Sequence, residues 1–284
     1  MRLMYYAIGG GLGHLVRAKT FLQMTGLTAQ TTVLTNSEFA EDPRIVDGLN
    51  ILAVPNSLQE NATDFRLWLI EQIEKLGAGC ICIDVFPAGI LGELCDLPRN
   101  LGVDFWHIAR LLRWDQYAPL INGTPPHYSR VWRLEALHPA HQQFLDAHCD
   151  RIDDFELIDA PMREQVDCTD PFWLIVHSGP EAEVAQIIAY AAEIRAIENR
   201  DVELWIASKH APGKLPASTR ILDAFPAQIY FNAAERIFSA AGFNVIRQTR
   251  AYREKHVVLP MPRRYDDQFE RARRGHSSRG DFTL

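Results

Sequence analysis

The sequence predicts an α/β protein built from two similar halves, each with a parallel sheet. Short apolar runs of about five residues recur along the chain and alternate with amphipathic stretches long enough to form helices. A glycine-rich turn follows the first apolar run, and a turn of small residues follows another run over 236–239. Strands that alternate with helices imply right-handed crossovers and a sheet covered on both faces. We therefore expect two Rossmann-like domains.

The first half begins with a buried strand over 3–8, a glycine loop over 9–13 and a helix over 15–24. Further strands are predicted at 31–34, 50–54, 80–83 and 103–107, with an amphipathic helix at 64–76. Prolines and aromatic residues between 110 and 129 predict a long functional or mobile loop. A helix over 138–148 and a short strand or connector over 151–158 complete this half.

The second half repeats the pattern, with a strand over 172–176, a tight turn over 177–180 and a long helix over 181–197. Strands are predicted at 202–207, 227–230, 236–239 and 256–259, and helices at 244–252 and 266–274. Prolines and polar residues between Asp159 and Pro171 indicate the linker. We expect domains over 1–160 and 161–284.

Composition excludes several classes of protein. The formal net charge of -7 argues against a general nucleic-acid binder, which needs a basic surface to release counterions. No apolar run approaches the roughly 20 residues that span a bilayer, and the N-terminus lacks the layout of a signal peptide. The five cysteines are scattered and odd in number. We expect a reduced, cytoplasmic protein.

The first motif is Gly9-Gly10-Gly11-Leu12-Gly13-His14, directly after the first strand. Glycines such as Gly10, Gly11 and Gly13 let a ligand approach the backbone, and the start of a helix favours an anion. No Gly-Lys-Ser/Thr follows, so it is not a P-loop, and it is a poor dinucleotide fingerprint. Such a turn can also serve only to pack a helix on a strand. His14 lies where α/β sheets bind ligands, or it bonds locally at the helix start.

Two acidic positions follow the strand over 80–83. Asp84 stands at the carboxyl end of this strand and points to the same crevice, although a turn or helix-capping role explains it equally well. Glu93 is expected on the helix that follows, as a surface charge.

A late motif runs Ser239-Ala240-Ala241-Gly242-Phe243-Asn244 and continues to Tyr265-Asp266-Asp267-Gln268. Backbone amides at Gly242–Asn244 can hold a diphosphate, and Asp267 and Gln268 can hydrogen-bond sugar hydroxyls. Asp266 has a structural explanation as a helix N-cap.

Together the motifs G-G-G-L-G-H-L-V-R-A, D-V-F-P-A-G-I-L-G-E-L and S-A-A-G-F-N … P-M-P-R-R-Y-D-D-Q-F-E-R-A-R resemble the GT-B glycosyltransferases. In that fold two Rossmann-like domains have parallel sheets that face across a cleft. The resemblance is to the transferases similar to the one that adds N-acetylglucosamine to the peptidoglycan lipid intermediate, and to bacterial predicted glycosyltransferases. It covers about a quarter of the chain, at 5–18, 82–95 and 236–274.

The resemblance implies an acceptor-side domain over 1–160 and a donor domain over 161–284. Its phosphate and nucleotide contacts are Ser178, Gly179, Gly242, Phe243 and Asn244, and its donor-sugar contacts are Asp267 and Gln268. His14 falls on a glycine-loop histidine that some members of the family use near the reacting centre. It usually has a ribose-binding glutamate where this chain has Gln248, and a glutamine loses the charge-assisted hydrogen bond.

These observations lead to a hypothesis: a metal-independent glycosyltransferase that uses a nucleoside-diphosphate sugar, UDP-linked by the resemblance. Either His14 or Asp84 is the general base on the acceptor hydroxyl, and no cofactor is expected. The acceptor, whether saccharide, lipid-linked or small molecule, is not identified. Arginines over 263–274 form a solvated helix face or meet phosphates or anionic lipid headgroups at a membrane surface.

Two rival hypotheses remain. The pattern G-x-G-H-x-x-R also resembles the UDP-sugar hydrolase of the pseudaminic acid pathway, in which His14 would activate water. The glutamine at position 248, where the family usually has a glutamate, also fits a degenerate GT-B protein that binds a sugar nucleotide or a partner without turnover. His138 and His141 have a spacing that suits a metal, but no third ligand is evident.

Overall fold

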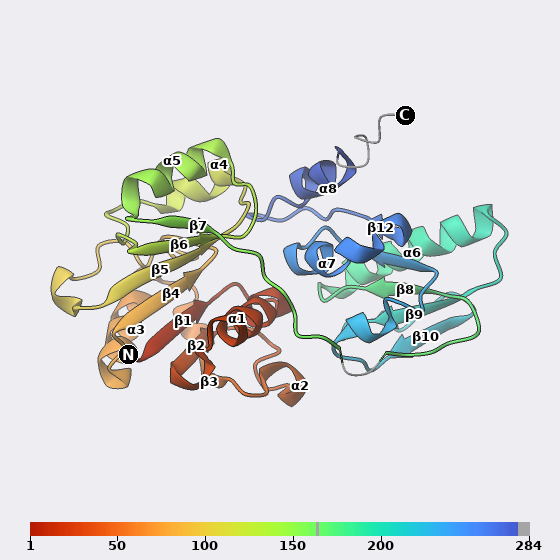
Figure 1. Ribbon diagram of the computed structural model, residues 1–284, viewed down its shortest axis with the longest axis horizontal. Coiled ribbons are helices and arrows are strands. Elements are labelled where there is room, and N and C mark those ends of the chain that lie inside the picture. Colours follow the sequence, from red (N-terminus) through yellow and green to blue (C-terminus); the bar gives the residue numbers. More distant parts are fainter. Residues whose placement is uncertain (163–164, 278–284) are drawn as a thin grey trace. The chain divides into compact units, whose positions relative to one another are not determined.

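The computed structural model describes residues 1–162 and 165–277 and divides into two compact units (Figure 1). Unit 1 comprises Met1–Ile158 together with Arg264–Asp266, and unit 2 comprises Asp159–Arg263 and the chain from Asp267 onward. The predicted boundary after residue 160 lies two residues from the division after Ile158. Nothing in the sequence predicts that Arg264–Asp266 belongs to unit 1. The predicted linker contains residues 163–164, which lie outside the described residues.

Unit 1 contains a parallel sheet of seven strands in the order β3-β2-β1-β4-β5-β6-β7. Its strands are β1 (Leu3–Ala7), β2 (Thr31–Thr35), β3 (Asn50–Ala53), β4 (Cys80–Asp84), β5 (Asp104–Ala109), β6 (Arg130–Arg133) and β7 (Ile152–Asp154). The central strands β1 and β4 are buried at every residue, as strands covered on both faces must be. β6 was not predicted from the sequence, because its two apolar residues are flanked by arginines and show no alternation, and because it follows a proline-rich segment.

Helices cover both faces of this sheet. The helices of unit 1 are α1 (Leu12–Thr25), α2 (Pro43–Val46), α3 (Ala62–Leu76), α4 (Trp114–Tyr117) and α5 (Pro139–His148). Tyr5 and Tyr6 are neighbours in β1 and point to opposite faces, as alternation in a strand requires. Tyr5 packs on Phe21 of α1, with ring centroids 6.0 Å apart, and Tyr6 packs on Phe65 of α3.

Unit 2 contains a second parallel sheet, in the order β10-β9-β8-β11-β12. Its strands are β8 (Phe172–Val176), β9 (Glu203–Ala207), β10 (Thr219–Leu222), β11 (Arg236–Ser239) and β12 (His256–Val258), and its helices are α6 (Glu181–Ile197), α7 (Phe243–Gln248) and α8 (Gln268–Ser277). One face packs on α6, through Val184, Ile187 and Ile188. The other face packs on Phe231 and Tyr252, which belong to short 3-10 segments.

Both sheets reverse their strand order at one point, between β1 and β4 in unit 1 and between β8 and β11 in unit 2. At such a switch point the following connections leave in opposite directions, and a crevice opens at the carboxyl ends of the two strands. The glycine loop follows β1, and Asp84 ends β4. In unit 2, Ser178 follows β8 and the turn at Gly242 follows β11. The glycine loop, Asp84, Ser178 and the turn at Gly242 therefore lie at the two switch points.

Three secondary-structure predictions differ from the structure. Residues 227–230 form a 3-10 helix, directly after Pro226, instead of a strand. The segment 110–129, predicted to be a long functional or mobile loop, contains the short helix α4, and its side chains Trp114, Tyr117 and Tyr128 are buried. Its prolines bound short packed turns. The single helix predicted over 244–252 is split into α7 and a 3-10 segment.

The expectation that Glu93 is a surface charge on a helix is also wrong. Glu93 lies in the loop after β4 and is fully buried. Its carboxylate accepts hydrogen bonds from the backbone amides of Ile90 (3.3 Å) and Leu91 (2.8 Å) and from the hydroxyl of Tyr6. The carboxyl group therefore organises the loop that follows Asp84, from the α3 side of the sheet.

The burial of Glu93 predicts a stability that depends on pH. Burial raises the pKa of Glu93 to about 7, although the amides of Ile90 and Leu91 oppose the rise. In the unfolded chain a glutamate titrates near its ordinary value of about 4.3. Between these values the folded protein holds a proton that the unfolded chain has released. The free energy of unfolding therefore falls as the pH rises through this range, by up to about 1.4 kcal/mol per pH unit.

We expect Glu93→Gln to remove this slope between about pH 5 and pH 7. Urea unfolding at a series of pH values measures it, with Glu71→Gln on the exposed side of α3 as the matched control. An unchanged slope in Glu93→Gln would show that Glu93 is not the titrating group.

Candidate active site and nucleotide-binding turn

The two candidate bases of unit 1 are in direct contact. His14 lies in the first turn of α1, and its Nδ1 is 2.6 Å from Oδ2 of Asp84 at the end of β4. The side chain of Asp84 is fully buried, and that of His14 is 9% exposed. The sequence named these residues as alternatives, whereas the structure makes them one pair. They meet because β1 and β4 are neighbours, so the glycine loop and the end of β4 share the carboxyl edge.

Two further side chains complete the surroundings of Asp84. Arg17 lies one turn after His14 on α1 and donates from Nε to Oδ1 and from Nη2 to Oδ2, both at 2.6 Å. The hydroxyl of Tyr5 lies 3.2 Å from Oδ1. The carboxylate thus accepts four hydrogen bonds. Arg17 was missed as a site residue although it stands in the motif G-H-L-V-R, where a spacing of three places it on the same helix face as His14.

Charge decides which member of the pair can accept a proton. Burial alone would raise the pKa of Asp84, but the Arg17 charge and the hydrogen bonds from His14 and Arg17 outweigh it and hold that pKa below its ordinary value. Asp84 is therefore ionised and fully hydrogen-bonded, which makes it a poor base. A carboxylate at Nδ1 selects the tautomer with the proton on that nitrogen and leaves Nε2 with its lone pair. Within the described residues Nε2 makes no hydrogen bond.

The glycine loop brings the backbone close to the imidazole. Gly9 has φ +154°, and a Cβ built there would lie 2.1 Å from Nε2 of His14. The amides of Gly9 and Gly10 both donate to Oδ1 of Asn36, at 2.9 and 2.8 Å, which fixes the loop to the end of β2. Val85, directly after Asp84, has φ +74° although it is β-branched and buried. Strain of this kind concentrates at functional sites.

An aromatic cluster built from three segments adjoins His14 through the ring of Phe86. The ring of Phe86 lies 5.9 Å from the imidazole, and Phe86 contacts Tyr117 and Tyr265 with centroids 5.6 and 5.8 Å apart. Tyr265 belongs to the segment that returns to unit 1, where Asp266 pairs with Arg110. Asp266 is therefore held in this ion pair, and the residue that caps α8 is Asp267.

In unit 2 the turn after β11 is held by side chains from the chain that follows it. Oε1 of Gln268 accepts hydrogen bonds from the amides of Ala241 (3.1 Å) and Met261 (3.0 Å), and Arg271 donates to the carbonyl of Ala241 (2.9 Å). Buried His256 bridges Ser239 at the end of β11 to Thr249 after α7. The predicted diphosphate contacts Gly242, Phe243 and Asn244 thus follow a backbone that is fixed in advance.

The predicted sugar contacts are partly engaged within the protein. Oδ1 of Asp267 accepts a hydrogen bond from the amide of Glu270 at 3.0 Å, a helix-capping role. Gln268 is 4% exposed and uses its carbonyl oxygen twice. Within the described residues its Nε2 makes no hydrogen bond, so this amide group can still donate to a ligand.

The turn after β8 is less suited to an anion. Ser178 is exposed, but the first turn of α6 carries Glu181 and Glu183, and carboxylates there repel a phosphate. Glu183 is neutralised by Arg263 and accepts from Nε2 of His177 at 2.8 Å. A Cβ on Gly179 would collide with both His177 and Glu183. Charge therefore favours the turn at Gly242 over Ser178 and Gly179.

Gln248 lies beside a carboxylate, that of Asp159, which the sequence did not reveal as its neighbour. Nε2 of Gln248 donates to Oδ2 of Asp159 at 3.1 Å, and Arg247 and Gln228 also bind this carboxylate, at 2.8 and 3.0 Å. Asp159 is the first residue of unit 2. An acidic side chain thus lies beside Gln248 although the two residues are 89 positions apart in the sequence. Local sequence patterns do not predict such a contact.

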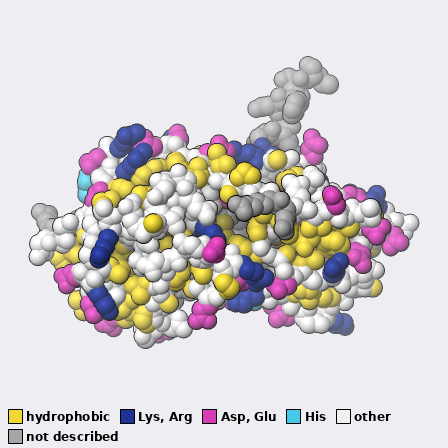
Figure 2. Space-filling model, turned by 60° about the horizontal axis from the view of Figure 1, so that its bottom comes forward, with side chains coloured by type: hydrophobic (Ala, Val, Ile, Leu, Met, Phe, Trp, Pro, Cys, Tyr) yellow, Lys and Arg dark blue, Asp and Glu magenta, His cyan; other side chains and the backbone are white. Residues whose placement is uncertain are grey.

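The other candidates have structural roles. Nδ1 of His138 accepts a hydrogen bond from the amide of Ala140 and caps α5, and buried His141 stacks on Trp114 at 4.3 Å. Among the described residues, no group of three or more His, Cys, Asp or Glu side chains is placed to hold a metal ion. No helix in that part of the chain is long and apolar enough to cross a bilayer. On the face in Figure 2, basic side chains are interspersed with acidic ones.

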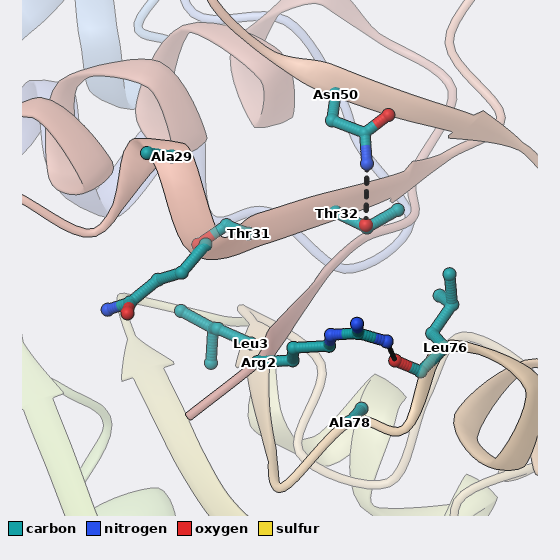
Figure 3. A pocket seen from close by; sticks show the side chains of 9 residues that line it. Arg2, Leu3, Ala29, Thr31, Thr32, Asn50, Leu76 and Ala78 are labelled. Carbon is teal, nitrogen blue, oxygen red and sulfur yellow. Dashed lines mark hydrogen bonds between the residues drawn. The ribbon is translucent and has the colours of Figure 1, made fainter.

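A hollow of about 450 Å³ opens at the other end of the sheet in unit 1 (Figure 3). Its lining comes from the start of β1, β2 and β3 and from the end of α3, and includes Arg2, Thr32 and Asn50. Arg2 donates to the carbonyl of Leu76, and Asn50 donates to Thr32. Ligands of parallel α/β sheets bind at the carboxyl ends of the strands, so this hollow at the amino ends is not the candidate site.

The contact between Gly9 and His14 yields a prediction. Gly9→Ala is expected to push the imidazole away from its present position and to cost about 1–3 kcal/mol, since the added methyl overlaps Nε2 and the φ value is strained for alanine. Gly11→Ala is the matched control, because nothing lies within 4 Å of its Cβ. Thermal unfolding and the histidine NMR signals measure the effect. Equal behaviour of the two variants would contradict this geometry.

Comparison with known proteins supports the fold. No family model and no curated protein matches the sequence. Among solved structures, the chain is similar to a spinosyn rhamnosyltransferase complexed with thymidine diphosphate, at 16% identity and a TM-score of 0.60, with 99% of this chain and 85% of the other covered.

A glycosyltransferase of kitacinnamycin has 14% identity and a TM-score of 0.63 over 97% of this chain and 84% of its own. The glycosyltransferase SnogD from Streptomyces nogalater has 14% identity and a TM-score of 0.54, over 92% and 81%. At this identity the likeness shows the fold, which is that of the GT-B glycosyltransferases, as the sequence predicts. The narrower resemblance to the peptidoglycan transferase family stays a prediction.

Proposed function

We propose that the protein is a glycosyltransferase that moves a sugar from a nucleoside-diphosphate sugar to an acceptor hydroxyl. The observation that carries the proposal is the His14–Asp84 pair, with a contact of 2.6 Å at the switch point of a GT-B fold. An oriented imidazole with a free Nε2 is suited to take a proton from a hydroxyl group at neutral pH. Function cannot be taken from the fold alone, and this pair is the chemical argument.

His14 is the general base of the proposed reaction, and Asp84 is its orienting partner. The acceptor oxygen attacks the anomeric carbon of the donor sugar while its proton passes to Nε2 of His14. The bond between this carbon and the diphosphate oxygen breaks, and the diphosphate leaves with the electron pair. The buried Asp84 carboxylate holds the imidazole through Nδ1 while Nε2 takes the proton, and this proton later returns to water.

Unit 2 holds the donor in this proposal. The backbone amides of Gly242, Phe243 and Asn244 meet the diphosphate, and Asp267 and Gln268 meet the sugar. Because Gln268 and Arg271 fix the preceding Ala241, the amides need little reorganisation as charge develops on the leaving group. The donor is proposed to be UDP-linked, and turnover is expected to persist when a chelator removes divalent metal ions. Ser178 and Gly179 are proposed as weaker contacts.

Unit 1 supplies the base and binds the acceptor. The aromatic side chains beside His14, among them Phe86, suit the apolar part of an acceptor. The neighbours named above include an enzyme crystallised with thymidine diphosphate, so thymidine-linked sugars belong in the donor screen beside UDP-linked ones. The proposed setting is the cytoplasm, where nucleotide sugars are formed, with contact to a membrane surface only if the acceptor is lipid-linked.

The test is a donor screen that measures nucleoside diphosphate release, with and without acceptors. With the donor that turns over, His14→Gln is expected to lower kcat by about 10²–10⁴-fold, since it removes the proton acceptor. Asp84→Asn is expected to lower kcat as well, because an amide at Nδ1 no longer fixes the tautomer. The matched control is His127→Gln, because His127 and Asp150 form a similar but exposed pair, with an N–O distance of 2.7 Å.

Three outcomes would contradict the proposal in different ways. Equal turnover in His14→Gln and wild type would exclude His14 as the base. Release of free sugar at the same rate without any acceptor would show a hydrolase, to which the motif G-x-G-H-x-x-R also points. Tight binding of a sugar nucleotide without turnover across a broad acceptor panel would show a degenerate binding protein.

A further inference from the structure

We infer that Arg17 is a positioning residue that keeps His14 in its neutral form, ready to accept a proton, by occupying the carboxylate that would otherwise stabilise the imidazolium. This inference deepens the proposed function and rests on it only for its catalytic meaning. The geometry itself lies within unit 1.

His14 and Arg17 share the carboxylate of Asp84. Oδ2 of Asp84 contacts both Nδ1 of His14 and Nη2 of Arg17, each at 2.6 Å, and Arg17 also binds Oδ1 through Nε. Nη2 of Arg17 lies 3.2 Å from Nδ1 of His14. A guanidinium with two parallel hydrogen bonds is the strongest partner that a carboxylate has in proteins. The negative charge of Asp84 is therefore already compensated before His14 takes a proton.

A charge count of the buried cluster leads to the same result. The charged groups that act on His14 are Asp84, Arg17 and Arg110, and Arg110 is itself paired with Asp266. Tyr5 reaches Asp84 through a hydrogen bond and stays neutral, since burial raises the pKa of its hydroxyl well above the ordinary value. With neutral imidazole the four charges sum to zero. Protonation of His14 would leave one uncompensated positive charge in a site where the side chain of Arg17 is 2% exposed.

The direction of the His14 titration agrees with this count. Burial lowers the pKa of His14, the hydrogen bond and the charge of Asp84 oppose this, and Arg17 and Arg110 lower it further. Nη2 of Arg17 lies 3.2 Å from Nδ1 of His14, and Arg17 also binds the carboxylate whose charge opposes the lowering of the His14 pKa. Removing Arg17 would free the charge of Asp84 for the imidazolium. Without Arg17, His14 would capture a proton from solvent at a higher pH and cease to be a base there.

Arg17 also constrains position. Its stem is part of α1, so its bond to Asp84 fixes the first turn of the helix against β4 and aligns His14 with the carboxylate. A purely structural Arg17 would hold the helix and leave the imidazole pKa unchanged. The pKa of His14 therefore separates the two roles.

The experiment is an NMR titration of histidine side-chain nitrogens in isotope-labelled full-length protein. The chain has ten histidines, and His14→Gln identifies the signals of His14. In the wild type we expect His14 to carry its neutral-form proton on Nδ1 and to have a pKa below the value of about 6.5 for an ordinary histidine. Arg17→Gln is expected to raise the pKa by about one unit or more, and Arg17→Lys, which keeps the cation, to leave it low.

A kinetic readout accompanies the titration. The acid limb of kcat/KM should follow the pKa of His14 and move to higher pH in Arg17→Gln. The NMR measurement needs no turnover, so an inactive protein with a low His14 pKa would contradict the proposed function and leave this inference standing.

Two results would overturn the inference: a wild-type His14 that titrates at or above about pH 6.5, or an Arg17→Gln variant with an unchanged His14 pKa. Arg17→Gln leaves a buried unpaired carboxylate and can fail to fold. In that event Arg17→Gln combined with Asp84→Asn is compared with Asp84→Asn alone, in which position 84 carries no charge and the direct effect of the Arg17 cation on the His14 pKa is measured. An upward shift on removal of Arg17 supports the inference, and no shift overturns it.

Discussion

The structure of unit 1 depends on how the buried carboxylate of Asp84 is satisfied. An ionised carboxylate removed from water is strongly unfavourable unless it is paired and hydrogen-bonded. Here Arg17 supplies the charge and, with His14 and Tyr5, all the hydrogen bonds. These donors come from β1 and α1, and the acceptor comes from β4. These contacts offset the cost of burying the Asp84 carboxylate. They also fix the glycine loop and orient the imidazole of His14 at the switch point.

In unit 2 the backbone after β11 is fixed by side chains from the chain that follows it. Gln268 and Arg271 lie one turn apart on α8 and bind the amide and the carbonyl of Ala241. The imidazole of His256 is hydrogen-bonded to both Ser239 and Thr249. In both units, then, side chains outside the reacting groups determine where the reacting groups stand.

The sequence predicted much of this arrangement, because its signals are local. Buried strands such as 172–176 and helices such as 181–197 agree with the structure, since apolar runs and amphipathic periods report burial directly. His14 and Asp84 were found as separate residues at strand ends. Their contact follows only from the strand order, which places β1 beside β4.

The features that the sequence missed arise from contacts far apart along the chain. Glu93 resembles a surface charge in its local context and is buried by Tyr6 across 87 residues. Asp159 reaches Gln248 across 89 residues, and Asp266 pairs with Arg110 across 156. Strand β6 carries no apolar alternation that separates it from a loop. The sequence pattern around a charged residue does not indicate a partner far away along the chain. These contacts were therefore not predicted.

The most direct measurement of the central claim is a thermal-shift screen of the purified protein against UDP, TDP, GDP, CDP and ADP and their common sugar conjugates. A ligand at about 100 times its dissociation constant stabilises the folded state by about 2.7 kcal/mol, which raises the melting temperature visibly. We expect one nucleoside diphosphate and its sugar conjugates to do so, and a bulky substitution at Gly242 to abolish the shift. Failure of every nucleotide at millimolar concentration would contradict the donor site and with it the account of a sugar transferase.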